Sequence, residues 1–124
     1  MNVVDSSGWL EYFADDPNAD FFAPAIENTN DLVVPSISIY EVFKRILQQR
    51  EESSALQAIA IMQQGLLVDM DTNMAMNAAK LSIEYSLPMA DSIILATAFL
   101  YDATLWTQDS DFSDIDGIKY VGKS

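Results

Sequence analysis

Five short apolar runs, separated by longer segments with helical spacing, constrain the fold of this chain more than any other feature of its sequence. The runs are typical of buried strands and cover residues 2–4, 32–34, 66–68, 104–107 and 118–121. Apolar periodicity predicts helices over residues 9–13, 18–27, 38–49, 55–64, 72–86 and 90–100. Strands that alternate with helices favour right-handed crossovers and parallel pairing. We therefore predict an α/β fold with a mainly parallel five-stranded sheet and helices on both faces.

Three residues are expected to mark the boundaries of these elements. Pro35 is expected to stop the second strand, Gly65 to cap the carboxyl end of the fourth helix, and Thr72 to cap the start of the fifth helix. Residues 108–116 are predicted as a polar loop with room for one helical turn.

Length and charge limit the classes of function. A chain of 124 residues, half of them hydrophobic, is expected to form one domain over residues 1–124 with a substantial core. Its nineteen acids and six bases give a formal net charge of −13. This charge disfavours binding of nucleic acid by broad electrostatic attraction, and it favours a basic partner, a bound cation, or both.

The absence of two residue types excludes several kinds of chemistry. The sequence contains no Cys and no His, which excludes disulfides, thiolate and imidazole metal sites, cysteine nucleophiles and triads that use His. Catalysis by this chain must therefore use carboxylates, hydroxyls, Lys, Arg, Tyr or metal ions.

The apolar segments are too short to predict a membrane protein. The N-terminus lacks the basic and long apolar segments of a signal peptide. The longest apolar stretch, residues 93–101, is much shorter than the ~20 residues needed to span a bilayer. We expect a soluble, cytoplasmic protein with no membrane partner.

Four acids stand beside predicted apolar structure. Asp5 follows the first strand, Glu41 and Asp91 lie in the first turns of two helices, and Asp109 comes just after the fourth strand. Each has a purely structural alternative: an N-cap for Asp5, a favourable helix N-terminus for Asp91, and a turn for Asp109. Glu41 has the strongest alternative, because it ends an S-x-x-E capping box that begins at Ser38.

The common position of these four acids favours a functional interpretation. All of them are predicted at the end of the sheet where ligands bind in open parallel sheets. Like charges at short range repel one another unless something positive lies among them. Hard cations such as Mg²⁺ or Mn²⁺ prefer oxygen ligands of this kind.

The ordered set of motifs resembles the PIN-domain family, and most closely the VapC-type toxins of toxin–antitoxin pairs. The motifs are Asp5 with Ser7 two residues later, Glu41 early in a helix, the segment MADSIILATA at residues 89–98, and LWTQDSDF at residues 105–112. The resemblance covers essentially the whole chain. It implies a three-layer PIN-like fold and a metal-dependent endoribonuclease.

The resemblance also implies roles for individual residues. The quartet that would bind one or two Mg²⁺ or Mn²⁺ ions is Asp5, Glu41, Asp91 and Asp109. Ser7 and Thr107 would orient carboxylates without binding the metal themselves. Asp111, two residues after Asp109, competes with it for the place of fourth ligand; the T-x-D match favours Asp109 and leaves Asp111 as an auxiliary acid.

The expected mechanism needs no protein base. A metal lowers the pKa of a bound water, supplies hydroxide near neutral pH and shields the phosphodiester from the carboxylates. By the resemblance, in-line attack on RNA would leave a 5′-phosphate and a 3′-hydroxyl. Lys44 and Arg45, which follow Glu41 on the same helix, are candidates for phosphate contacts, with a solvated helix surface as the alternative. Specific recognition of one structured RNA, such as a tRNA, would suit so acidic a protein.

Two protein partners are expected from the resemblance and the charge. A basic antitoxin would place an Arg or Lys at the acidic pocket, and a second copy of the chain would form a homodimer, for which the helix at residues 73–83 is a candidate surface. Ordinary core packing is the alternative for the candidate residues of an antitoxin groove, which are Trp9, Tyr12, Phe13, Phe43 and Leu47.

Two other classes of function compete with the nuclease. An aspartyl-phosphate phosphatase would have an Asp where this chain has Ser7, and a receiver-type signalling domain would have an early acidic pair and a Lys after the last strand, whereas Lys119 lies within it. A catalytically silent binding module would keep the fold and engage only a protein, and the complete acidic quartet disfavours it.

Overall fold

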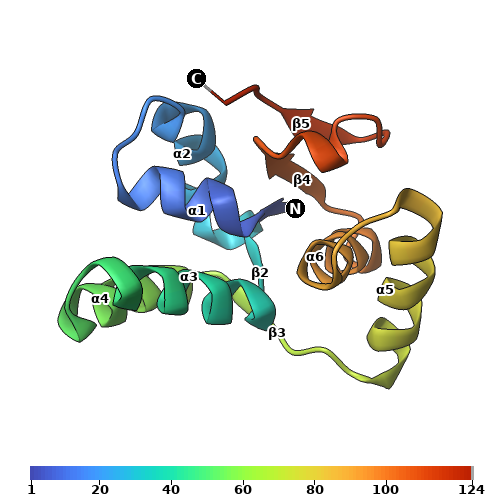
Figure 1. Ribbon diagram of the computed structural model, residues 1–124, viewed down its shortest axis with the longest axis horizontal. Coiled ribbons are helices and arrows are strands. Elements are labelled where there is room, and N and C mark those ends of the chain that lie inside the picture. The colour runs from blue at the N-terminus through green and yellow to red at the C-terminus, as the bar shows by residue number, and fades with distance from the viewer. Residues whose placement is uncertain (124) are drawn as a thin grey trace.

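The computed structural model describes residues 1–123, which form five strands, six α-helices and two short 3₁₀ helices (Figure 1). The strands are β1 (Asn2–Val4), β2 (Val33–Pro35), β3 (Leu66–Val68), β4 (Thr104–Thr107) and β5 (Ile118–Tyr120). The helices are α1 (Ser6–Phe13), α2 (Ala19–Glu27), α3 (Ser36–Gln49), α4 (Glu52–Met62), α5 (Thr72–Tyr85) and α6 (Met89–Leu100). The 3₁₀ helices are η1 (Thr29–Asp31) and η2 (Ser110–Phe112).

All strand pairs are parallel, which confirms the predicted α/β arrangement. The strands divide into a three-stranded sheet of order β1-β4-β5 and a two-stranded sheet of β2 and β3. A single parallel bridge between Asn2 and Leu32 connects the two sheets. In the larger sheet Val3 is opposite Leu105 and Val4 is opposite Trp106, so β1 and β4 end side by side.

Alternation along the buried strands divides the core in two. Successive strand side chains point to opposite faces, and accordingly Val3 and Val33 belong to one apolar cluster while Val4 and Val34 belong to the other. The first cluster takes its helical residues chiefly from α5 and α6, and the second takes them from α1 to α4. Figure 1 shows these two helical groups on opposite sides of the strands, so the predicted helices on both faces are confirmed.

Several predicted boundaries are wrong by a few residues for identifiable reasons. Pro35 is the last residue of β2 instead of the residue after it, and α3 begins directly at Ser36. The N-cap of α5 is Asp71, whose carboxylate accepts the Met74 N–H at 2.8 Å, so Thr72 is the first helical residue. Gly65 is not the cap of α4; a Cβ there would lie 3.0 Å from the Leu32 carbonyl oxygen, so the glycine permits close approach to the next strand.

No single helix within residues 1–123 is long and apolar enough to cross a membrane. Helices α5 and α6 would pass as a pair on length and composition alone, and they are bent by 113° relative to each other.

Candidate metal centre and active site

Asp5 connects the end of β1 to both the next helix and the neighbouring strand. The residue is 2% exposed. Its carboxylate accepts hydrogen bonds from the Gly8 backbone N–H at 2.8 Å, from the Ser7 hydroxyl at 3.0 Å and from the Thr107 hydroxyl at 2.6 Å. Asp5 is therefore the N-cap of α1, as the structural alternative predicts, and it also holds the end of β4. The two hydroxyl residues expected to orient a carboxylate both contact Asp5.

The start of α1 lies close to its neighbours because Gly8 has no side chain. A Cβ on Gly8 would lie 2.6 Å from the Phe22 ring and 2.7 Å from a Val4 methyl group. Any side chain at this position would push α1 away from β1. The close packing therefore fixes the turn that carries Asp5.

The pKa of Asp5 is raised to about 6, chiefly because burial disfavours the charged carboxylate. The hydrogen bonds from Thr107, Gly8 and Ser7 lower the pKa but only partly offset burial, and the nearby charge of Asp109 raises it further. A positive ion beside Asp5 would therefore stabilise its ionised form.

Glu41 lies on α3 and accepts a hydrogen bond from the Ser6 hydroxyl at 2.6 Å. The capping-box interpretation of this residue is wrong. Helix α3 begins at Ser36, two residues before the proposed cap, and Ser38 is fully buried with no hydrogen-bond partner for its hydroxyl in the described chain. The Glu41 side chain instead reaches across to the first residue of α1, next to Asp5.

Asp91 lies in the first turn of α6, a helix whose following seven residues are buried. Burial raises its pKa to about 7, and negative charges raise it further. The contributing acids, from the largest effect to the smallest, are Asp109, Asp5, Glu41 and Asp111. Asp91 therefore lies within electrostatic reach of every other acid that the sequence singles out.

Asp109 and Asp111 lie together at the end of β4. The Asp109 backbone N–H donates to the Thr107 hydroxyl at 2.9 Å, and one Asp109 carboxylate oxygen accepts the Asp111 N–H at 2.9 Å. Asp109 is thus the N-cap of η2. Asp91, Asp109 and Asp111 each present a carboxylate oxygen, and the three oxygens lie within 4.8 Å of one another. Asp111 is the most exposed of the three.

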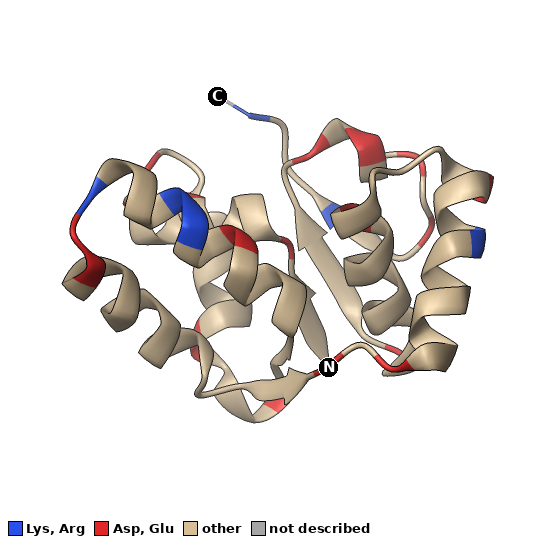
Figure 2. Ribbon diagram, turned by 60° about the horizontal axis from the view of Figure 1, so that its bottom comes forward, with Lys and Arg blue, Asp and Glu red and all other residues tan. Residues whose placement is uncertain are grey.

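Most of the residues of the predicted site line one open pocket of about 430 Å³. Its lining includes the four acids Asp5, Glu41, Asp91 and Asp109, together with Ser7, Lys44 and Arg45. Both basic residues predicted to contact phosphate therefore border the acids. Figure 2 shows where all acids and bases of the chain lie on the ribbon. Thr107 lies beneath the pocket, fully buried, and acts on it through Asp5.

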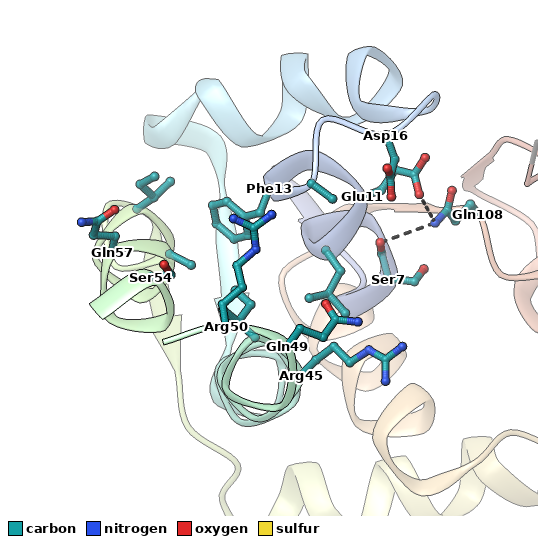
Figure 3. A pocket seen from close by; sticks show the side chains of 15 residues that line it. Ser7, Glu11, Phe13, Asp16, Arg45, Gln49, Arg50, Ser54, Gln57 and Gln108 are labelled. Carbon is teal, nitrogen blue, oxygen red and sulfur yellow. Dashed lines mark hydrogen bonds between the residues drawn. The ribbon is translucent and has the colours of Figure 1, made fainter. Parts of the chain in front are cut away.

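Sequence reasoning missed two residues that support this pocket. Ser6, the middle residue of the D-x-S start, is bonded to Glu41, but motif matching drew attention to Ser7 instead. Gln108 is 6% exposed, and its amide donates to Glu11 at 3.1 Å (Figure 3). The same amide group accepts a hydrogen bond from Asn18 at 3.0 Å. Its only signal in the sequence is its place between Thr107 and Asp109.

The residues predicted to line an antitoxin groove have different environments. Trp9 is fully buried, and its ring stacks on that of Phe13 at 5.7 Å. The Tyr12 hydroxyl donates to Glu27 at 2.9 Å. Phe43 is partly buried against the core, whereas Leu47 is 41% exposed. The packing alternative is thus confirmed for Trp9, and Leu47 stays available at the surface.

The donor set fits a divalent cation. Four other carboxylates lie close enough to Asp91 to raise its pKa beyond the effect of burial, and a bound cation would relieve this repulsion. Oxygen-only ligands of this type suit Mg²⁺ and Mn²⁺. The structure thus defines a class of protein: an α/β protein with an acidic pocket at the carboxyl ends of parallel strands.

Within that class, the chain belongs to the PIN-domain family. Residues 3–118 match the model of the PIN domain. No curated protein matches the sequence significantly.

Solved structures of toxin–antitoxin systems have the same fold. A chain from a toxin–antitoxin complex of Klebsiella pneumoniae is 22% identical, with 95% of each chain covered and a TM-score of 0.80. The VapC20 toxin of Mycobacterium tuberculosis, which cleaves the sarcin–ricin loop, is 13% identical, with a TM-score of 0.80 over 96% of this chain and 98% of the toxin. A chain of VapBC2 from Rickettsia felis, bound to promoter DNA, is 15% identical, with a TM-score of 0.74 over 98% and 97%.

Proposed function

We propose that this chain is a metal-dependent endoribonuclease and the toxin of a type II toxin–antitoxin pair. The observation that carries the proposal is the position of Asp91, surrounded by four other carboxylates in a pocket at the strand ends. Membership of the PIN-domain family and the fold shared with VapC-type toxins support it.

In this proposal Asp5, Glu41, Asp91 and Asp109 hold one or two Mg²⁺ or Mn²⁺ ions. A metal held by these residues would supply a water of lowered pKa and would shield the phosphodiester from the carboxylates. Asp111 is an auxiliary acid near Asp91 and Asp109.

Hydroxyl groups hold the proposed ligands in place. Ser7 and Thr107 fix the Asp5 carboxylate, and Ser6 fixes Glu41. Hydrogen bonds of this kind to metal ligands orient them and tune their affinity. The pocket is thus organised by groups that do not themselves bind the metal.

The proposed substrate is a structured RNA, for which tRNA is the first candidate. Lys44 and Arg45 border the pocket and would bind backbone phosphates on either side of the cut. Hydrolysis would leave a 5′-phosphate and a 3′-hydroxyl. That the Mycobacterium tuberculosis neighbour cleaves the sarcin–ricin loop makes ribosomal RNA the second candidate.

The proposed partners are a basic antitoxin and a second copy of this chain, in the cytoplasm. The net charge of −13 favours a basic segment that would place an Arg or Lys among the acids. Exposed apolar residues on α5, Met76 at 55% and Ile83 at 84%, make this helix the candidate surface for a homodimer. Light scattering of the purified chain would measure the dimer directly.

The nuclease is tested by incubating the purified chain with a mixed pool of tRNA and structured RNA. Parallel reactions contain Mn²⁺, Mg²⁺ or EDTA, and an Asp91→Asn variant is compared with Asp20→Asn. Asp20 is a matched control because it also lies in the first turn of a helix, α2, but is exposed. The expected result is cleavage that requires metal, persists in Asp20→Asn and is lost in Asp91→Asn.

Other outcomes would contradict the proposal. Equal cleavage by wild type and Asp91→Asn would show a contaminating nuclease. Failure of the wild type both to cleave RNA and to bind Mn²⁺ in a calorimetric titration would favour the silent binding module.

A further inference from the structure

A second groove adjoins the acidic pocket. It has a volume of about 480 Å³ and lies between α1, α3 and α4. Figure 3 shows side chains from all three helices facing this space, including Phe13 of α1, Gln49 of α3 and Gln57 of α4. Ser7, Leu10 and Arg45 line both the groove and the acidic pocket, so a ligand chain can pass from one to the other without leaving the surface.

Charge discriminates between the possible occupants of this groove. The chain has six basic residues against nineteen acids, and two of the six, Arg45 and Arg50, line the groove. They are five residues apart on α3 and its C-cap, which corresponds to ~7.5 Å along a helix axis. Glu11 and Asp16 also line the groove, but the two arginines on its α3 side would attract a phosphate backbone.

The carboxylate of Glu11, at the acidic end of the groove, is engaged in hydrogen bonds with groups of the protein. Glu11 accepts the Asn18 backbone N–H at 2.8 Å and the Gln108 amide at 3.1 Å. Asp16 lies at the same end, away from Arg50 (Figure 3). A polyanion is therefore directed along the α3 side of the groove.

The remaining lining suits a nucleobase. Gln49 and Gln57 are exposed and present amides that both donate and accept hydrogen bonds, as the edges of bases require. Leu10 and the partly buried Phe13 offer apolar surface against which a base can pack. The volume of the groove falls within the ~300–1,000 Å³ of small-ligand sites.

We propose that this groove is a subsite for a nucleotide adjacent to the scissile phosphate of the RNA. Arg45 and Arg50 bind backbone phosphates on that side of the cut, and Gln49 and Gln57 contact the base of the nucleotide. The inference rests on the proposed nuclease function and adds a determinant of sequence preference. A base preference beside the cut would give selectivity to a protein whose overall charge repels RNA.

The test measures binding of four fluorescein-labelled homopolymeric hexaribonucleotides by fluorescence anisotropy in Ca²⁺, with gels to verify that the RNA stays intact. Titrations at several salt concentrations give the slope of log Kd against log salt. Arg50→Ala is compared with Lys80→Ala, and Gln57→Ala with Gln64→Ala. Both control residues are exposed and lie outside the groove, and thermal unfolding confirms that each variant is folded.

Arg50→Ala and Gln57→Ala are expected to change different properties of RNA binding. Arg50→Ala should reduce the magnitude of the salt slope by about 0.7, the value for one lost phosphate contact on a single strand. Gln57→Ala should leave the slope unchanged and weaken binding of the preferred base by about fivefold, which alters the ranking of the four oligomers. The Lys80→Ala and Gln64→Ala controls should match the wild type.

Cleavage of the RNA pool with Mn²⁺, run in parallel, separates this inference from the nuclease itself. If the wild type cleaves RNA and both groove variants bind all four oligomers with its affinity and slope, the subsite is wrong while the nuclease stands. The groove would then be assigned to a protein partner. If the wild type neither binds nor cleaves RNA, both proposals are wrong.

Discussion

The acids at strand ends and the acids on helices reach the same pocket by different routes. Asp5 is held by three donors and joins β1, α1 and β4, so it is part of the framework of the fold. Asp91 lies in the first turn of α6, where burial and four other acids raise its pKa. We infer that Asp5 contributes both to folding and to the proposed metal site, whereas Asp91 contributes to the proposed metal site at a cost to stability.

The largest expected effect is on stability, and it should have opposite signs for substitutions of Asp5 and of Asp91. Asp5→Ala removes the N-cap of α1 and leaves Gly8 and Thr107 without their acceptor, so it should lower the free energy of unfolding by about 2 kcal/mol at pH 5. Asp91→Asn removes a repelled charge and should raise the stability of the metal-free protein at pH 8. Urea denaturation in EDTA measures both variants.

A second cap supplies the control for this comparison. Asp71 caps α5 through one bond to the Met74 N–H at 2.8 Å, so Asp71→Ala should lose only the ~1 kcal/mol of an ordinary N-cap. An equal loss for Asp5→Ala and Asp71→Ala would contradict the framework role of Asp5. A loss of stability in Asp91→Asn would contradict the repulsion at Asp91.

The pH dependence of the metal-free protein is the next effect. The pKa of Asp5 is about 6 and that of Asp91 about 7, both above the ordinary pKa of 3.8 for an Asp side chain. Between pH 5 and pH 8 the folded state therefore holds more protons than the unfolded state, and stability falls as pH rises. Asp5 alone contributes about 1.4 kcal/mol, since its pKa exceeds pH 5 by about one unit. The partly exposed Asp91 adds to the fall.

Metal should remove this dependence, because a cation binds the ionised carboxylates. Urea denaturation at pH 5, 6, 7 and 8 in EDTA and in Mn²⁺ measures it. Stability that increases with pH in EDTA would show that neither carboxyl resists ionisation. Identical curves with and without Mn²⁺ would show that no metal binds at these acids.

The same comparison explains how much the sequence could predict. Strand-end acids are visible because a short apolar run stops at them, and parallel pairing brings such ends together, as it does for Asp5 and Thr107. Two-residue periodicity likewise separates Val3 from Val4 across the two cores. Local sequence patterns are sufficient to predict these features, because they depend only on how side chains alternate along a strand and on how parallel strands pair.

Contacts between distant elements could not be predicted from the sequence, because they depend on how the elements pack. The capping box at Ser38 is a valid local pattern, but α3 starts two residues earlier and turns Glu41 toward Ser6, which is 35 positions away in sequence. The hydrogen bond that Gln108, just after β4, donates to Glu11 spans 97 positions, and the one that it accepts from Asn18 spans 90. Nothing within a local window of sequence carries information about such pairs.

Ser6 gives a third, smaller test, because it is the donor to the helix-borne Glu41. Ser6→Ala should weaken Mn²⁺ binding by about tenfold, the lower end for loss of a group that orients a metal ligand. Isothermal titration calorimetry measures the affinity. The control is Ser53→Ala, which removes an exposed Ser–Glu hydrogen bond of 3.4 Å to Glu51 and should change nothing. Equal Mn²⁺ affinities for Ser6→Ala and the wild type would show that the hydrogen bond from Ser6 is not needed to orient Glu41.

The smallest expected effect concerns the choice between Asp109 and Asp111. Asp109 lines the pocket and is anchored by its bonds to Thr107 and to the Asp111 N–H, whereas the Asp111 carboxylate is exposed. Interactions of exposed charges contribute about 0.2–1 kcal/mol, so Asp111→Asn should weaken Mn²⁺ binding by about threefold in the same titration. Asp109→Asn should weaken it more. The reverse order would make the exposed acid the fourth ligand and reduce Asp109 to the cap of η2, which would shift the proposed metal toward solvent.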